Sequence, residues 1–249
     1  DDIVKQMADV PGITVLDVDP GPDTNRTVVT IVGSPEAVGE AAFQGIKRAS
    51  EILDMSQHFG THPRMGATDV CPFIPISGVT DEECIDLSKQ VGKRVGDELG
   101  IPVYLYEKSA QKLDREKLPT IRKGEYEGLP EKLKDVNWKP DFGPAERHVR
   151  GGATVMGCRE FLIADNINLN TKDHRLATDI AFELREAGRS KRTANPNSKN
   201  LLNGEIVRNE DGKPVKIPGM FKDVKGIGWY VELFNRAQIS INFNNYKVS

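Results

Sequence analysis

The stretch FGTHPRMGATDVCPF, from Phe59 to Phe73, surrounds a histidine with residues that control backbone shape. Pro63 disfavours a helical conformation at His62, so the imidazole is held on extended chain. Gly60 and Gly66 permit sharp turns and the close approach of another group. With an ordinary pKa of about 6.5, such a histidine can move protons near neutral pH. The residues alone leave two interpretations open: a proton-transfer site, or a histidine that occupies a turn.

Charged residues close to this stretch could complete a site. Arg64 can hold a carboxylate in a two-pronged fork, and Asp69 can orient an imidazole. Asp19 stands at a predicted strand end, with Asn25 and Arg26 at the turn that follows. The alternative interpretation is ordinary turn and surface chemistry for all five residues.

Two further motifs contain residues that could carry chemistry. His58 and His62 are four residues apart, but Gly60 and Pro63 interrupt a helix and no third ligand is evident, so we expect no metal. The glycine-rich run GPAERHVRGGATVMG matches neither a phosphate loop nor a dinucleotide fingerprint. Its glycines could instead let backbone lie against a flat ligand.

Composition narrows the class of protein. The 249 residues are 38% hydrophobic and 29% charged, which is a globular balance for one large domain or two smaller ones. A net charge of −3 gives no reason to expect nucleic acid, and no apolar run approaches the roughly 20 residues that span a membrane. The three cysteines form no C-x-x-C pair, which predicts buried thiols and a reducing cytoplasm.

The elements that must position these residues are readable in the first part of the chain. Strands are predicted at 13–19 and 26–33, joined by a turn as an antiparallel hairpin. A helix is predicted over 34–55, with Ser34 as its N-cap. A second helix over 80–100 opens with a capping box of Thr80 and Glu83 and ends at Gly100. Further strands are predicted at 69–77 and 101–107. Residues 108–150 are polar and contain several prolines and glycines.

The second part repeats this mixture of elements. A strand is predicted at 161–169 and a helix at 171–188, with Ile180, Leu184 and Ala187 facing inward. A small hairpin turns at Asp211–Gly212, and the last strands cover 226–233 and 237–248. The order predicts an α+β fold, an α/β sandwich of two ferredoxin-like subdomains at 1–157 and 158–249, each a mixed sheet covered by helices.

Several long motifs in order resemble the glutamate formimidoyltransferase family, in its bacterial form. They are LDVDPGPDTNRTVVTIVG, HPRMGATDVCPFIPISGV, PVYLYE, WKPDFGP, FLIADNINL and GIGWYVE. The resemblance implies transfer of a formimidoyl group from N-formimidoyl-L-glutamate to N5 of tetrahydrofolate, in histidine degradation. Tetrahydrofolate would be a co-substrate, no metal would take part, and a cytoplasmic homodimer is expected.

The resemblance also implies roles for residues. It implies that His62 is the catalytic histidine. Beyond the resemblance, we expect Asp19 or Asp69 to orient His62 or relay a proton, and on charge grounds we expect Arg64 or Arg26 to hold a glutamate carboxylate. The glycines around His62 are expected to present backbone to substrate. The folate-contacting segment is expected at Gly143, Pro144, Ala145, Glu146, Arg147, His148, Val149, Arg150, Gly151 and Gly152.

Two alternative functions stay open at this point. The chain could move a formyl group instead, with the same histidine, or it could bind folate without catalysis. Compared with the family, we also expect elements to be missing before Asp1 and after the final NNYKVS.

Overall fold

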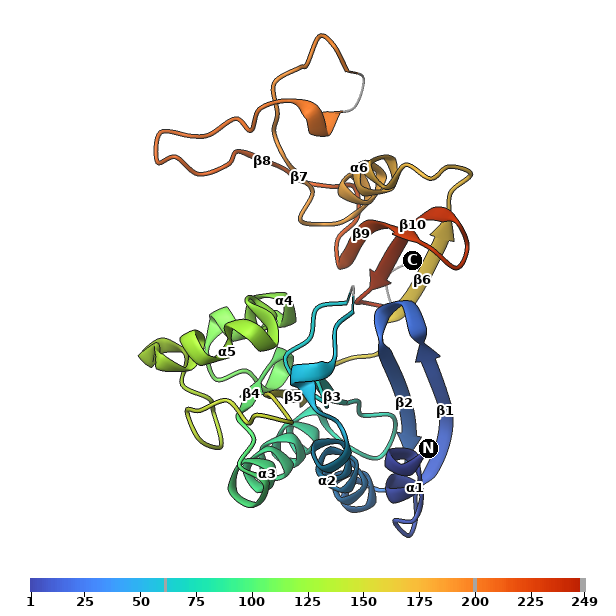
Figure 1. Ribbon diagram of the computed structural model, residues 1–249, viewed down its shortest axis with the longest axis vertical. Coiled ribbons are helices and arrows are strands. Elements are labelled where there is room, and N and C mark those ends of the chain that lie inside the picture. The colour runs from blue at the N-terminus through green and yellow to red at the C-terminus, as the bar shows by residue number, and fades with distance from the viewer. Residues whose placement is uncertain (61, 199–200, 247–249) are drawn as a thin grey trace. The chain divides into compact units, whose positions relative to one another are not determined.

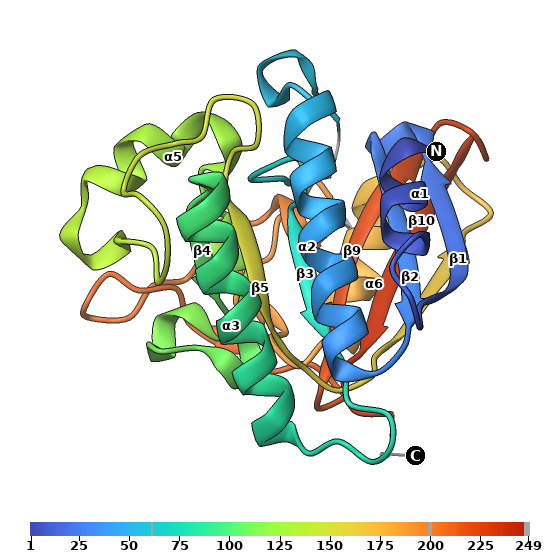
Figure 2. The same cartoon turned by 90° about the horizontal axis from the view of Figure 1, so that it is seen from below.

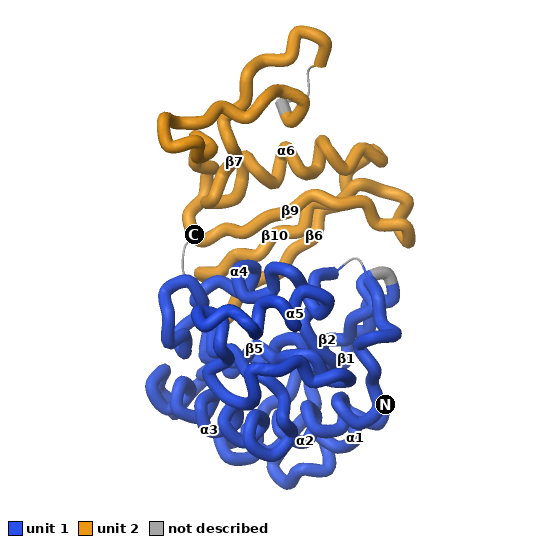
Figure 3. The backbone as a smooth tube through the Cα atoms, turned by 60° about the vertical axis from the view of Figure 1, so that its left-hand side comes forward, with its two compact units in different colours: residues 1–159 blue, residues 160–249 orange. Residues whose placement is uncertain are grey.

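The computed structural model describes residues 1–60, 62–198 and 201–246 (Figure 1). The chain forms two compact units, Asp1–Arg159 and Glu160–Ser249 (Figure 3). Both contain helices and sheets, so the expected α+β class is confirmed. The elements of the first unit are α1 (Asp2–Ala8), β1 (Thr14–Gly21), β2 (Arg26–Val32), α2 (Pro35–Ile52), β3 (Val70–Phe73), α3 (Asp81–Leu99), β4 (Val103–Leu105), α4 (Leu118–Arg122), α5 (Glu125–Lys134) and β5 (Thr154–Cys158).

The predicted local signals of the first unit are present. β1 and β2 pair antiparallel from Thr14 opposite Val32 to Gly21 opposite Arg26. The Thr80 hydroxyl accepts a hydrogen bond from the Glu83 amide at 3.2 Å, and the Glu83 carboxylate accepts one from the Thr80 amide at 2.8 Å. These two bonds satisfy amide groups that the helix itself leaves unpaired, so α3 begins at Asp81.

A parallel sheet in the order β3-β5-β4 forms the centre of the first unit. Neighbouring residues along β4 and β5 point to opposite faces. Val103, Leu105 and Met156 pack with α2 and α3, which lie side by side (Figure 2). Tyr104 and Val155 pack on the other face with residues of α4 and α5. The sheet is therefore a buried layer between two apolar cores.

The second unit has a simpler core. Its elements are β6 (Ile163–Asn168), α6 (His174–Leu184), β7 (Arg189–Ser190), β8 (Lys216–Ile217), β9 (Val224–Val231) and β10 (Arg236–Phe243). β6, β10 and β9 form an antiparallel sheet, and α6 buries Ala177 and Ala181 against it. The motifs FLIADNINL and GIGWYVE thus contribute its two outer strands.

Three details of the second unit differ from expectation or confirm it. The prediction that Ala187 faces inward was wrong, because α6 ends at Leu184 and Ala187 is exposed. The final strand ends at Phe243, and positions 247–248 of its predicted range lie outside the described residues. The small hairpin is confirmed by the hydrogen bond from the Asn209 amide to the Lys213 carbonyl oxygen, at 2.8 Å, around Gly212.

Candidate functional site

The loop from His58 to Asp69 joins α2 to β3 and is fixed against the glycine-rich segment. The Ala153 amide donates to the Met65 carbonyl at 3.1 Å, and the Ala67 amide donates to the Gly151 carbonyl at 3.0 Å. Between these bonds Gly66 and Gly152 form an antiparallel bridge. A Cβ atom on Gly66 would lie 2.3 Å from the Ala153 carbonyl oxygen. Close packing against the chain's own backbone therefore accounts for this glycine, and its expected contact with substrate stays a prediction.

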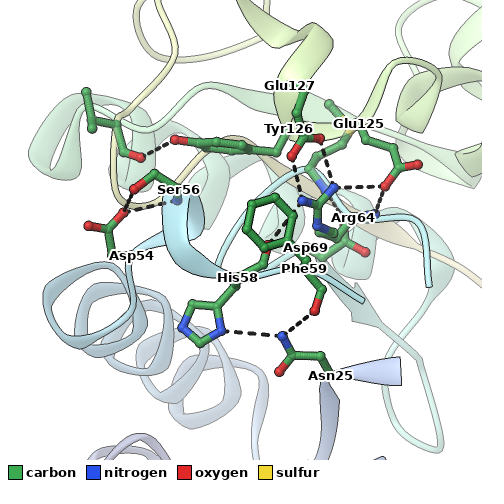
Figure 4. A network of polar contacts seen from close by, with 12 residues as sticks. Asn25, Asp54, Ser56, His58, Phe59, Arg64, Asp69, Glu125, Tyr126 and Glu127 are labelled. Carbon is green, nitrogen blue, oxygen red and sulfur yellow. Dashed lines mark hydrogen bonds and ion pairs between the residues drawn. The ribbon is translucent and has the colours of Figure 1, made fainter. Parts of the chain in front are cut away.

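The turn of the β1–β2 hairpin holds the other end of the loop. Asn25 takes a left-handed conformation with φ 48°, and its side-chain amide donates to the Phe59 carbonyl at 2.8 Å (Figure 4). A Cβ atom on Gly60 would lie 2.6 Å from the Thr24 carbonyl oxygen. Close approach of the hairpin therefore explains the glycine, as the sequence predicted, and brings Arg26 to the loop.

The ring of His62 is held at both nitrogen atoms. Its Nδ1 lies 2.8 Å from the Pro63 carbonyl oxygen, and its Nε2 lies 2.6 Å from a guanidinium nitrogen of Arg26. A carbonyl can only accept and a guanidinium can only donate a hydrogen bond. The two partners therefore assign the proton to Nδ1 and leave the lone pair of Nε2 facing Arg26.

The surroundings of His62 favour this neutral form. Burial lowers the pKa of the imidazole below its ordinary value of 6.5, and the positive charges of Arg26 and Arg122 lower it further. The Pro63 carbonyl and Asp69 act in the opposite direction but do not prevail. His62 is therefore a neutral hydrogen-bond acceptor at pH 7, which is the state that a general base requires.

Neither aspartate considered as a partner of His62 bonds its ring. Asp69 accepts the Met65 amide at 2.8 Å and forms an ion pair with Arg122. Asp19 is exposed on β1, where its charge acts on Arg26. The Pro63 carbonyl orients the imidazole instead. Sequence reasoning missed Arg122, because it ends a helix in a segment that looked irregular.

Arg64 is bound by carboxylates of the chain itself. Its guanidinium lies 2.9 Å from a Glu125 oxygen and 2.6 Å from a Glu127 oxygen, and it also donates to the His58 carbonyl (Figure 4). Both glutamates belong to α5. The guanidinium fork that was expected to hold a substrate carboxylate is therefore occupied, and it fastens the loop to this helix.

Residues 143–150 of the expected folate-contacting segment are exposed or half-buried, whereas Gly151 and Gly152 are buried. Pro144, Glu146, Arg147, His148, Val149 and Arg150, with Gly100, line a shallow hollow of about 410 Å³; Ala145 is exposed beside it. His148 accepts the Gly151 amide at Nδ1, at 2.8 Å, and thereby shapes the turn. Gly143 has φ 80° and packs against Gly96. The segment thus combines a fixed backbone with exposed side chains.

Two further features bear on cysteine and metal chemistry. Burial raises the pKa of the Cys71 and Cys158 thiols to about 12, which keeps them protonated and poorly nucleophilic. Among the described residues no group of three or more histidine, cysteine, aspartate or glutamate side chains is placed to hold a metal. In the same part of the chain, no helix is both long and apolar enough to cross a membrane.

Comparison with known proteins identifies the family. Residues 1–159 match the model of the N-terminal subdomain of the formiminotransferase domain, and residues 164–249 match that of the formiminotransferase domain. The chain therefore belongs to the formiminotransferase family.

Relatives from distant organisms match almost all of the chain. Formimidoyltransferase-cyclodeaminase of Mus musculus is 49% identical over 100% of the chain, and that of Dictyostelium discoideum is 48% identical over 99%. The chain spans 41% of the length of each. Glutamate formimidoyltransferase of Streptococcus pyogenes serotype M1 is 40% identical over 99% of the chain and 73% of its own length.

Proposed function

We propose that this chain transfers the formimidoyl group from N-formimidoyl-L-glutamate to N5 of tetrahydrofolate, as a step of histidine degradation. Membership of the formiminotransferase family and the names of the relatives support the reaction class. The observation that carries the proposal is His62, a neutral imidazole whose Nε2 lone pair is available once Arg26 moves from it. Assembly as a homodimer and a cytoplasmic location stay predictions from the sequence.

His62 acts as base and then as acid in the proposed mechanism. N5 of tetrahydrofolate attacks the formimidoyl carbon, and Nε2 of His62 accepts the N5 proton as the N5–C bond forms. The tetrahedral intermediate then collapses: the bond between carbon and the glutamate nitrogen breaks, and the imidazolium gives its proton to that nitrogen. One residue thus accepts the proton and returns it, and the proposed steps require no metal.

Arg26 is the best candidate for the group that holds a substrate carboxylate. Among the described residues it forms no hydrogen bond with a carboxylate. Burial lowers the pKa of its guanidinium, and the positive charge of Arg122 lowers it further. A substrate carboxylate would attract both guanidinium groups. We propose that this attraction draws Arg26 away from Nε2, so that the base is exposed only when the donor is bound.

The hollow at residues 143–152 is proposed to contact tetrahydrofolate. Its backbone is fixed through the bridge between Gly66 and Gly152, which ties it to the loop that carries His62. Positioning two substrates contributes much of the acceleration in a reaction of this kind. Asp69 is proposed to support the site by holding Arg122 and the Met65 amide, and Asp19 by its charge on Arg26.

A donor comparison tests the proposed reaction. Tetrahydrofolate is offered together with N-formimidoyl-L-glutamate or with N-formyl-L-glutamate, and the modified folate is measured. We expect transfer from the formimidoyl donor to dominate. Dominant transfer from the formyl donor would replace the proposed substrate, and tetrahydrofolate binding with no transfer from either donor would favour a binding module.

Substitution of His62 tests its role. His62→Ala is expected to retain tetrahydrofolate affinity and to lose roughly 10²–10⁴-fold in turnover, because the proton has no acceptor. The control is His174→Ala, which removes an exposed histidine from α6 in the other unit. Near-normal turnover in His62→Ala would exclude His62 as the base.

A further inference from the structure

A second hollow lies wholly within residues 160–249, where β7 and β8 leave the body of the unit beside α6 (Figure 1). Its volume of about 330 Å³ falls in the range of sites for small molecules. The lining residues are Phe182, Arg185, Arg189, Ser190, Arg192, Leu202, Lys216 and Ile217. Four of them are cations, and two of these belong to the basic run GRSKR that the proposed reaction does not use.

One of the four cations is neutralised within the chain. Arg189 is only 8% exposed, and its guanidinium lies 2.5 Å from an Asp179 oxygen and 2.8 Å from a Glu183 oxygen. Both carboxylates come from α6. Arg189 therefore fastens β7 to the helix and adds little charge to the hollow.

The other three cations have neutral partners. Arg185 donates to the Gly188 carbonyl at 2.9 Å and stacks 4.0 Å from the ring centre of Phe182. Arg192 donates to the Gly204 carbonyl, and Lys216 donates to the Ser190 hydroxyl. None of the three forms an ion pair with a carboxylate among the described residues. Burial lowers the pKa of Arg185, which is the expected effect of desolvating a cation without a counter-charge.

The walls of the hollow are held by tight backbone packing. A Cβ atom on Gly188 would lie 1.9 Å from the Ile217 carbonyl oxygen, so only glycine fits between β7 and β8. The Lys191 amide donates to the Val215 carbonyl at 2.7 Å, and the Val207 amide donates to the Lys191 carbonyl at 2.9 Å. The cations are therefore carried by backbone segments that these hydrogen bonds connect to one another.

We propose that this hollow binds a small phosphorylated molecule, with its phosphate at Arg185, Arg192 and Lys216 and its uncharged part against Phe182, Leu202 and Ile217. Guanidinium groups bind phosphate through paired hydrogen bonds, and ammonium groups bind it as point charges. Three positive charges without carboxylate partners exceed what one carboxylate can balance, whereas a phosphate monoester or diphosphate brings two or more negative charges. None of the residues proposed for the transfer reaction lines this hollow.

Calorimetric titration with inorganic pyrophosphate tests the site on the whole chain. We expect wild type to bind and the double variant Arg192→Gln, Lys216→Gln to bind about tenfold or more weakly, because two of three phosphate contacts are removed. The matched control is Arg208→Gln, Lys213→Gln, which removes two cations from the small hairpin around Gly212, outside the residues that line the hollow. It should change the affinity by less than about twofold. Circular dichroism checks that each variant is folded.

Three results would overturn the proposal. The first is that wild type does not bind pyrophosphate. The second is that the control variant weakens binding as much as the Arg192→Gln, Lys216→Gln variant does. The third is that citrate binds more tightly than pyrophosphate. The last result would assign the hollow to polycarboxylates instead. Titration of His62→Ala should match wild type, so failure of this site is distinguishable from failure of the proposed reaction.

Discussion

The two halves of the loop between α2 and β3 differ in the partners of the arginine that each half contacts or contains. In the half from Arg64 to Asp69, the guanidinium of Arg64 forms ion pairs with two carboxylates, and Gly66 forms a backbone bridge with Gly152. In the half that ends at His62, the partner of the loop is Arg26 of β2, which bonds a neutral imidazole. Among the described residues Arg26 forms no hydrogen bond or ion pair with a carboxylate, although the charges of Asp69 and Asp19 act on it. A satisfied charge fastens the loop, whereas an unsatisfied one is available to a substrate. Changes in the first half should therefore alter stability, and changes in the second should alter chemistry.

The largest stability effect is expected at the paired glycines. In Gly152→Ala the new Cβ would lie 2.1 Å from the Met65 carbonyl oxygen, at a residue with φ 69°. Overpacking and left-handed strain together should lower the free energy of unfolding by about 2–5 kcal/mol. Urea denaturation measures it.

Gly78→Ala is the matched control for this substitution. Gly78 has the same φ of 69°, but a Cβ there meets nothing within 4 Å. It should cost only the strain, about 1–2 kcal/mol. Equal losses in the two variants would mean that the contact between the loop and the glycine-rich segment adds no constraint.

The helical signals of this chain were predictable because they are local. The capping box of α3 and the N-cap of α2 each lie within four residues of sequence. β5 was not predicted, because its five residues are buried on both faces and show no alternation. α4 and α5 were missed because Pro119 and Pro130 punctuate them, and burial of residues such as Leu129 against the sheet overrides that signal.

The candidate site was predictable only in part for the same physical reason. Pro63 and the flanking glycines indicated an extended, closely packed histidine loop. The partners of Arg64 are about 60 positions away in sequence, on a helix that was not predicted, so spacing could not reveal that its fork is filled. Arg122 was missed because its helix was not predicted. Its contribution to lowering the pKa of His62 was therefore missed as well.

A smaller stability effect is expected for the arginine of the fastened half. Arg64→Gln removes two ion pairs with half-exposed glutamates and a hydrogen bond to the His58 carbonyl. The free energy of unfolding should fall by about 1–2 kcal/mol, since solvent screens both pairs. Lys134→Gln, which breaks the largely exposed ion pair with Glu131, is the control and should change stability by less than about 0.5 kcal/mol. A loss no larger than in this control would show that Arg64 does not fasten the loop.

We expect the substitution of Arg26 to have the smallest effect on stability and a distinct effect on the kinetics. Arg26→Gln should reduce kcat/KM about tenfold, the loss of one charged contact to a substrate carboxylate. Because Arg26 lowers the pKa of His62, its removal should raise that pKa. The proposed general base acts only when His62 is neutral, so the acid limb of the profile of kcat/KM against pH should move to higher pH. Arg64→Gln should leave the limb in place; a shift of equal size there would erase the distinction between the two halves.

The most direct test of the account is the protonation of His62, measured by ¹⁵N NMR of the imidazole, with the signals assigned by their loss in His62→Ala. We expect a proton on Nδ1, none on Nε2 at pH 7, and a pKa below 6.5 for the imidazole. A ring with its proton on Nε2, or one that is doubly protonated at pH 7, would contradict it.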